Sequence, residues 1–395
     1  MTRNKTLRLA VFFTLLIAVV VVRFVLLRQK SFVPLDEIPS SYGKGGLDFN
    51  DSQMVLKIQG APEELGEQHG RLLKKSIRKM VQGYVIEQVC NNDKSYLNRL
   101  LARVQKMKPA LPKWYLAELA ACARAAGVDE DILLLAQSEG DIASLEGAGN
   151  VKGHACSAYV LYGRDSVAAG NMIAGRNFDY AAGNFIHNCV TTMYVAPDAK
   201  DGHSFVSVGW VGILGGWTLL NEHGLLVANH LGGGPAKNPA GIPTLVMSRI
   251  IAQKASDIDE ALALMRRLPR MRGQILWMAQ PEDKEKNRGA RAVAVEYDAD
   301  KLYVREAEQG VLIVTNQNLV FGRKTVPSGG ERNSASSQLE KEVANISSDY
   351  LQVLKTPAHH ATAHTVFFDF SRKCFHVAHG CYPAYDGKFA KYRFP

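Results

Sequence analysis

A change of pattern near Gly153 limits the fold of this chain more than any other feature. Between Pro62 and Gly153, apolar residues recur at helical spacing and predict helices over residues 62–90, 97–108, 113–126 and 129–142. Beyond Gly153, short apolar segments alternate with turn-forming residues such as Asn221–Gly224. Helices gathered in one block, followed by strands joined through hairpins, predict a layered α+β fold with antiparallel sheets rather than a doubly wound parallel sheet.

The predicted strands are short. One precedes the helices at residues 54–59, and the others lie at 157–161, 172–178, 205–210, 217–220, 225–229, 292–297, 301–305, 311–315, 365–370 and 374–379. The three strands between residues 292 and 315 are predicted to form one meander, because tight turns separate them. Two more helices are predicted over residues 256–268 and 334–354.

The net charge of +9 first suggests an anionic partner such as nucleic acid. Its distribution argues otherwise. Residues 1–30 contain six Lys or Arg and no Asp or Glu, so they carry +6, and the remaining 365 residues carry only +3. A hydrophobic content of 47% predicts a globular chain with an ample core and excludes a disordered one. We therefore expect no nucleic-acid partner.

The same N-terminal residues contain a long apolar segment. Leu9–Val22 is almost entirely apolar, and Phe24–Leu27 continues it beyond Arg23. About 19 residues of this kind can cross a bilayer. A cleaved signal peptide is the alternative, but no small-residue cleavage site follows Val22. The sequence favours an uncleaved signal anchor over residues 1–30 with the catalytic part outside the cytoplasm, and the Pro-, Ser- and Gly-containing residues 31–53 are predicted as a tether.

The six cysteines have no CxxC spacing, which argues against a zinc ribbon or a thioredoxin-type motif. Cys374 and Cys381 either pair or remain free thiols, and the sequence leaves both open. His359, His360 and His364 lie near one another, but Pro357 and the following strand oppose the helix that a zinc motif of this spacing needs. We expect no metal and no cofactor.

The segment His154–Tyr180 contains the residues best suited to catalysis. Its sequence is HACSAYVLYGRDSVAAGNMIAGRNFDY, with a cysteine at the start of one predicted strand and an Arg and an Asp at the end of the next. A hairpin brings Arg176 and Asp179 back beside Cys156. Strand alternation places Arg176 and Asp179 on opposite faces, unless the strand breaks at Asp179.

Cys156-Ser157 together with Gly175–Tyr180 (GRNFDY) resembles the N-terminal-nucleophile (Ntn) hydrolases of the isopenicillin N acyltransferase-like family, which is similar to acid ceramidase-type and choloylglycine hydrolases. Further segments resemble the family in order and spacing: Gly60–Gly70, Asn221–Leu225, Thr315-Asn316, Arg332 and His364–Asp369. Ala155 departs from the Gly of the penicillin enzymes. The resemblance implies a four-layer αββα sandwich, with residues 54–155 as a helical pro-region (α part) and residues 156–395 as the catalytic β part.

The resemblance also implies a mechanism. Self-cleavage between Ala155 and Cys156 frees an α-amine, whose pKa of roughly 7.7–8.0 suits a general base for the neighbouring thiol. The implied site residues are Cys156 as nucleophile, Asp179 for the α-ammonium, Arg176 for orientation, Asn316 and then Asn229 as oxyanion donors, and Arg332 for the N-terminus or substrate. Their substrate would be a small linear N-acyl amide. Acyl transfer to an amine is the alternative reaction, and an uncleaved binding or scaffold protein is the alternative class.

Overall fold

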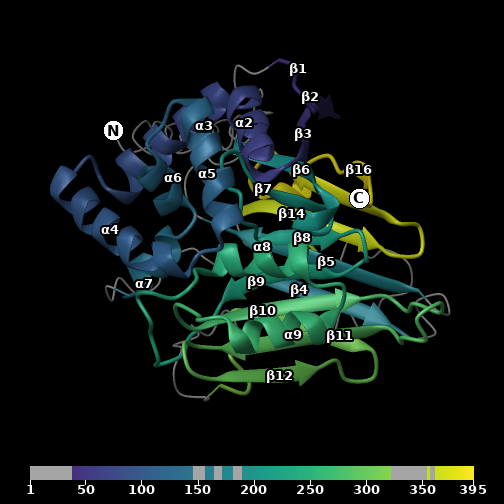
Figure 1. The fold of residues 1–395 in the computed structure, drawn as a ribbon. Coiled ribbons are helices and arrows are strands. Elements are labelled where there is room, and N and C mark those ends of the chain that lie inside the picture. The colour runs from purple at the N-terminus through teal and green to yellow at the C-terminus, as the bar shows by residue number, and fades with distance from the viewer. Residues whose placement is uncertain (1–37, 146–155, 164–170, 181–188, 322–353, 356–360) are drawn as a thin grey trace, which may run out of the picture.

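Two antiparallel sheets and two groups of helices form the molecule (Figure 1). The computed structural model describes residues 38–145, 156–163, 171–180, 189–321, 354–355 and 361–395. Side chains from both sheets and from both helix groups meet in one hydrophobic core that includes Leu56, Leu119, Val160, Leu226 and Val366. The predicted mixed α+β class with antiparallel sheets is confirmed.

The larger sheet has ten strands in the order β1-β2-β3-β6-β7-β8-β9-β10-β11-β12. Their bounds are β1 Ser40–Tyr42, β2 Gly45–Asn50, β3 Gln53–Gly60, β6 Val190–Pro197, β7 Phe205–Trp210, β8 Thr218–Asn221, β9 Leu226–Leu231, β10 Gln274–Gln280, β11 Arg291–Tyr297 and β12 Leu302–Glu306. The β3–β6 pair is parallel, whereas the other neighbours are antiparallel. This pair joins the N-terminal part of the chain to the part that follows Cys156.

The smaller sheet has six strands in the order β13-β4-β5-β14-β15-β16. Their bounds are β4 Cys156–Tyr162, β5 Met172–Asp179, β13 Val311–Thr315, β14 Thr362–Asp369, β15 Cys374–His379 and β16 Ala390–Arg393. The central strands β4, β5 and β14 are almost wholly buried. They therefore provide a rigid base for Cys156, Arg176 and Asp179.

The helices before Cys156 form one group and two later helices form another. The first group comprises α2 Pro62–Leu72, α3 Lys74–Met80, a π-helix at Val81–Val89, α4 Lys94–Met107, α5 Lys113–Ala126, α6 Glu130–Ala136 and α7 Glu139–Leu145. A short 3-10 helix at Lys108–Ala110 follows α4, and two others lie outside both groups, at Ala199–Asp201 and Ala384–Asp386. α8 Thr244–Lys254 and α9 Ile258–Arg267 pack against strands β8, β9 and β10 of the larger sheet (Figure 1).

Several predicted elements differ from the structure. The helix predicted at 129–142 is divided into α6 and α7, and β6, β10, β16 and α8 were not predicted. Residues 40–50, predicted as part of the tether, form β1 and β2, because β2 pairs with β3 at the edge of the larger sheet. The predicted meander is divided, since β13 leaves β12 and pairs with β4 in the smaller sheet. The single helix predicted at 62–90 is broken where Leu73 leaves helical geometry to lie fully buried in the core.

The segment predicted as a membrane anchor, residues 1–30, and all but the last residue of the helix predicted at 334–354 lie outside the described residues. Within the part of the chain that the structure describes, each helix is too short or too polar to cross a bilayer.

Candidate active site

Cys156 is the first residue of β4, in the interior of the smaller sheet. The register of β4 and β5 pairs Cys156 with Phe178 and Ala158 with Arg176. Directly opposed residues and residues two apart share one face of an antiparallel pair, so the Cys156 thiol and the Arg176 guanidinium lie on the same face. The Arg176 guanidinium and the Asp179 N–H both act on the sulfur in the direction that favours its thiolate form.

The Arg176 guanidinium is fully buried and is fixed by the larger sheet. Its Nη1 donates to the Thr218 Oγ1 at 2.6 Å and to the Trp217 carbonyl, and its Nη2 donates to the Asn229 carbonyl at 2.5 Å. The guanidinium carbon also lies 5.3 Å from the centre of the Phe178 ring. Neutral carbonyls hold this cation in place and leave its charge directed at Cys156, which is the geometry expected of an orienting residue.

Burial raises the pKa of the Cys156 thiol, and the Asp179 carboxylate raises it further, against the opposite effects of Arg176 and of the Asp179 N–H. A buried thiol of this kind is a weak nucleophile in the intact chain, because the reactive form is the thiolate. The site therefore needs a base beside the sulfur. No His lies in the cavity around Cys156 within the described chain.

Asp179 is the last residue of β5, and the register with β14 shifts beside it, between Thr362 and His364. The extra residue of this irregularity is Ala363 of β14, so β5 itself continues to Asp179, and Asp179 lines the same cavity as Cys156. The Thr362 hydroxyl donates to its Oδ1 at 2.6 Å. Burial nevertheless raises the pKa of Asp179 to about 8, against the lowering effects of Thr362 and Arg176. A cation formed beside this carboxyl would stabilise its charged form.

The two predicted oxyanion donors lie on different sheets. Asn316 is 2% exposed and directly follows β13, whose Thr315 pairs with Ser157 of β4, so the ladder carries it alongside Cys156. Asn229 of β9 lines the cavity, but its Nδ2 donates to the Gly216 carbonyl at 3.0 Å and to the Ser248 hydroxyl at 3.3 Å. Donation from Asn229 to an oxyanion would require giving up one of these bonds. Ala155 and Arg332 lie outside the described residues.

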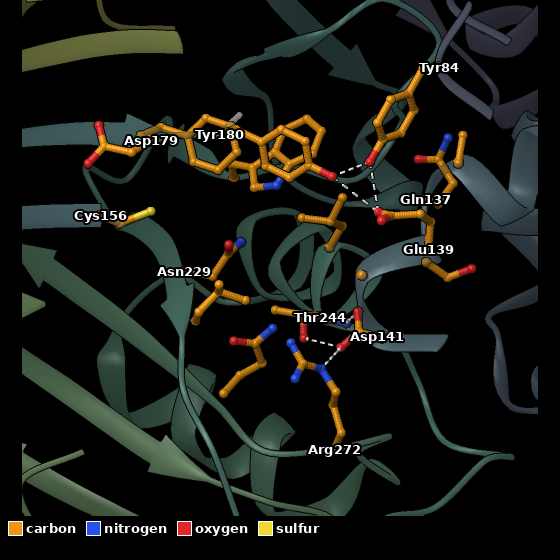
Figure 2. Close-up of a pocket in the computed structure, with 18 residues that line it drawn as sticks. Tyr84, Gln137, Glu139, Asp141, Cys156, Asp179, Tyr180, Asn229, Thr244 and Arg272 are labelled. Atoms are coloured by element: carbon orange, nitrogen blue, oxygen red, sulfur yellow. Dashed lines mark hydrogen bonds and ion pairs between the residues drawn. The ribbon is translucent and has the colours of Figure 1, made fainter. Parts of the chain in front are cut away.

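The cavity that contains Cys156 lies between the two sheets and the helices of the α part (Figure 2). Trp217, Leu231 and Leu245 supply apolar lining from the β part. Two polar clusters complete the wall. Tyr84 and Tyr180 contact each other and Glu139, and Asp141 accepts from the Thr244 hydroxyl and from Arg272 Nε, both at 2.9 Å.

Sequence reasoning missed most of these wall residues. Tyr180 lies inside the GRNFDY motif and could have been suspected from it. Tyr84, Glu139 and Asp141 belong to helices of the α part, and no local pattern distinguishes them from other helix residues. The break between α6 and α7 positions Glu139 and Asp141, because Gln137 lies at the break and bonds the Gly212 carbonyl at 2.8 Å and the Leu214 N–H at 2.8 Å.

Side chains of the α part and of α8 also hold the glycine-rich loop at residues 212–216. His69 Nε2 accepts from the Gly212 N–H at 3.0 Å, and Arg249 donates to the Leu214 carbonyl at 2.7 Å. Arg249 in turn forms a buried ion pair with Glu118 at 2.8 Å. The loop follows β7 and leads into Trp217, which lines the cavity, and into β8. The α part therefore supports one wall of the cavity through its contacts with this loop.

A group of potential metal ligands lies elsewhere. His203, which precedes β7, and Glu222 and His223, in the turn between β8 and β9, place ligand atoms within 4.8 Å of one another. The two histidines are hydrogen-bonded at 3.1 Å, and none of the three residues lines the cavity around Cys156. Cys374 and Cys381 are free thiols.

Two antiparallel sheets around a buried Cys, Arg and Asp define the class, the Ntn hydrolases. A family model for acyl-coenzyme A:6-aminopenicillanic acid acyl-transferase matches residues 167–380, more than half of the chain, and the chain belongs to this family. Its members act as amidohydrolases or acyltransferases on linear amides. The resemblance inferred from Cys156-Ser157 and GRNFDY is thereby confirmed.

Individual relatives are distant. An uncharacterized protein of Archaeoglobus fulgidus is 25% identical over 280 residues, which cover 65% of this chain and 46% of the relative. The chain thus spans about half the length of this curated relative. An N-acylethanolamine-hydrolyzing acid amidase ortholog of Caenorhabditis elegans is 15% identical, with a TM-score of 0.41 over 61% of this chain and 100% of that chain. Penicillin V acylase of Agrobacterium tumefaciens is 13% identical, with a TM-score of 0.38 over 57% of this chain and 83% of that chain.

Proposed function

We propose that the protein is a self-processing N-terminal-cysteine amidohydrolase that cleaves a linear N-acyl amide through a thioester on Cys156. The observation that carries the proposal is the arrangement of Cys156 and Asp179 along one cavity, with the fully buried Arg176 on the same face of the β4–β5 pair as Cys156. The family to which the chain belongs supports the reaction class.

Cleavage of the Ala155–Cys156 bond supplies the missing base. The new α-amine lies on the same residue as the thiol, and its ordinary pKa of roughly 7.7–8.0 lets it accept and return a proton near neutral pH. Asp179 holds the α-ammonium form, which favours the charged state of a carboxyl whose pKa burial has raised to about 8. The nucleophile then needs no histidine.

The acyl transfer itself follows from the same geometry. The thiolate attacks the amide carbonyl, and Asn316 donates to the developing oxyanion, with Asn229 as the second donor. Losing such a donor costs on the order of 10²–10³ in kcat. The α-ammonium protonates the leaving amine. The α-amine then deprotonates a water molecule, which hydrolyses the thioester. Arg332 is assigned to binding the N-terminus or the substrate. An amine in place of water would give acyl transfer.

The first test is processing. Purified wild-type protein should give two bands on a denaturing gel, the larger fragment beginning with Cys156, whereas Cys156→Ala should remain one full-length band. Wild-type protein that stays full-length, without an N-terminal cysteine, would refute the mechanism.

The second test is turnover. A panel of N-acyl amides should release free acid with wild-type protein and not with Cys156→Ala. Adding an acceptor amine distinguishes the two reactions, since an acyltransferase would form the new amide in preference to the acid.

We assign the membrane anchor to residues 1–30 and the catalytic part to the outside of the cytoplasm. The apolar run Leu9–Val22 and the charge of +6 in these residues support this assignment. Full-length protein should remain in the membrane fraction after alkaline carbonate extraction, and a chain that begins at residue 31 should be soluble. Full-length protein extracted by carbonate would contradict the anchor.

We propose the four-layer αββα sandwich for the whole protein. One face of the smaller sheet is apolar and buried, and Leu354 packs there with Tyr159, Leu161, Ile173 and Phe367. Such a cluster needs a covering layer to stay away from water.

A further inference from the structure

The wall of the cavity opposite Cys156 contains the carboxylate of Glu139, in the first turn of α7 (Figure 2). One of its oxygens is already bonded, because Oε2 accepts from the Tyr84 hydroxyl at 2.8 Å and from the Tyr180 hydroxyl at 3.4 Å. The other oxygen, Oε1, has no hydrogen-bond partner among the residues that the structure describes. The two tyrosines thus fix the carboxylate and leave one oxygen available as an acceptor.

The charges around the cavity leave Glu139 unbalanced. Arg272, the cation that acts on Glu139 within the described chain, is itself paired with Asp141 at 2.9 Å. Asp179 lies beside Arg176 and, in the proposed mechanism, beside the α-amine of Cys156. That amine is neutral when it acts as the base, so it does not balance Glu139.

We propose that Glu139 binds a protonated amine of the substrate, so that the substrate class is a linear N-acyl amide with a cationic group away from the scissile bond. This inference rests on the proposed function. The carboxylate of Glu139 is half-buried and therefore only partly hydrated, and a substrate ammonium provides both an opposite charge and hydrogen-bond donors for Oε1. Burial raises the pKa of Glu139, as expected of a carboxylate without a cation of its own.

A substrate carboxylate is the competing occupant, because Arg272 also lines the cavity. Its guanidinium charge is already offset by Asp141, and Thr244 holds the same Asp141 through its N–H at 3.0 Å and its hydroxyl at 2.9 Å. An anion would also be repelled by Glu139. The described charges therefore favour the cation.

The test compares matched N-acyl amides of equal length that end in an ammonium, an uncharged isosteric group or a carboxylate. The ending is placed on the acyl side in one series and on the amine side in another. In one of the two series, wild-type kcat/KM should be at least about tenfold higher for the ammonium compound than for the uncharged one. Glu139→Gln, which keeps an acceptor for the tyrosines, should remove this preference and leave the uncharged compound within about twofold.

Glu282→Gln is the matched control, because Glu282 is exposed and lies outside the cavity. It should retain the wild-type preference. Equal kcat/KM for the ammonium and uncharged compounds in both series, or a preference for the carboxylate, would overturn the inference while Cys156-dependent hydrolysis would still support the proposed function.

Binding to Cys156→Ala protein keeps the inference testable without turnover. Calorimetry with an alkylammonium and with its uncharged isostere should show tighter binding of the ammonium, and the Cys156→Ala/Glu139→Gln double variant should lose that difference. Absence of the difference in Cys156→Ala protein argues against the cation site. Absence of Cys156-dependent turnover for every amide counts against the proposed function instead.

Discussion

At the scale of single residues, Asp179 contributes a pH dependence that belongs to the unprocessed chain. Its folded pKa of about 8 lies far above the value of about 3.9 in an unfolded chain. Between these values the folded state binds the additional proton, so the free energy of unfolding must fall as pH rises through this window. The contribution is fully present below about pH 4 and is lost above about pH 8.

We expect the Cys156→Ala precursor to lose up to about 1.4 kcal/mol of stability per pH unit between pH 5 and 8 from this group, the value for one proton. Denaturant unfolding at several pH values measures the slope. Asp179→Asn in the same background should flatten it. An unchanged slope in the double variant would mean that Asp179 does not titrate in this range.

At the scale of elements, the contact between α2 and α5 explains two glycines that the sequence motif Gly60–Gly70 contains. A Cβ at Gly66 would lie 2.0 Å from the Glu118 carbonyl oxygen, and one at Gly70 would lie 2.4 Å from the Cys122 carbonyl oxygen. The two helices can approach this closely only because these positions have no side chain. The motif is therefore a packing requirement of the α part as well as a family resemblance.

Gly70→Ala should lower the free energy of unfolding by about 1–3 kcal/mol through overpacking. The sign is diagnostic, because Ala in place of Gly within a helix otherwise stabilises by up to about 1 kcal/mol. Thermal or denaturant unfolding provides the measurement. Gly289→Ala is the control, since a Cβ there meets no atom within 4 Å. A Gly70→Ala protein as stable as the control would contradict the close contact.

At the scale of the whole molecule, the α and β parts form one body. β3 of the α part pairs with β6 of the β part from Met54–Thr191 to Gly60–Pro197. Two buried ion pairs, Glu118–Arg249 at 2.8 Å and Asp141–Arg272 at 2.9 Å, also join the two parts. The proposed cleavage before Cys156 would break none of these contacts.

The two fragments should therefore elute together in size-exclusion chromatography under native conditions and separate only in denaturant. Glu118→Gln should lower the denaturant concentration at which they separate, because it leaves Arg249 buried without its partner, and removing one partner of a buried pair costs about 3–5 kcal/mol. Loss of the α fragment from native wild-type protein would show that it is only a removable pro-segment.

The sequence alone determined the features that depend on neighbouring residues. The patterns of helix α5 at 113–126 and of strands β7, β13 and β15 match the observed bounds, and Cys156-Ser157 with GRNFDY indicated the family. Local spacing governs these elements, so local reasoning finds them. Strand alternation placed Asp179 on the face away from Arg176 unless β5 breaks there, and it did not predict that Asp179 lines the cavity of Cys156 from an unbroken β5.

Only the tertiary structure decided which segments meet. β13 lies in the smaller sheet because it pairs with β4, where Val311 is opposite Leu161, 150 residues earlier in the sequence. Residues 40–50 form strands because β2 pairs with the edge of β3. The cavity wall is similar: Tyr84 and Glu139 reach Tyr180 from separate helices of the α part. Contacts of this kind depend on the packing of the whole chain, which leaves no periodic signal in any one segment.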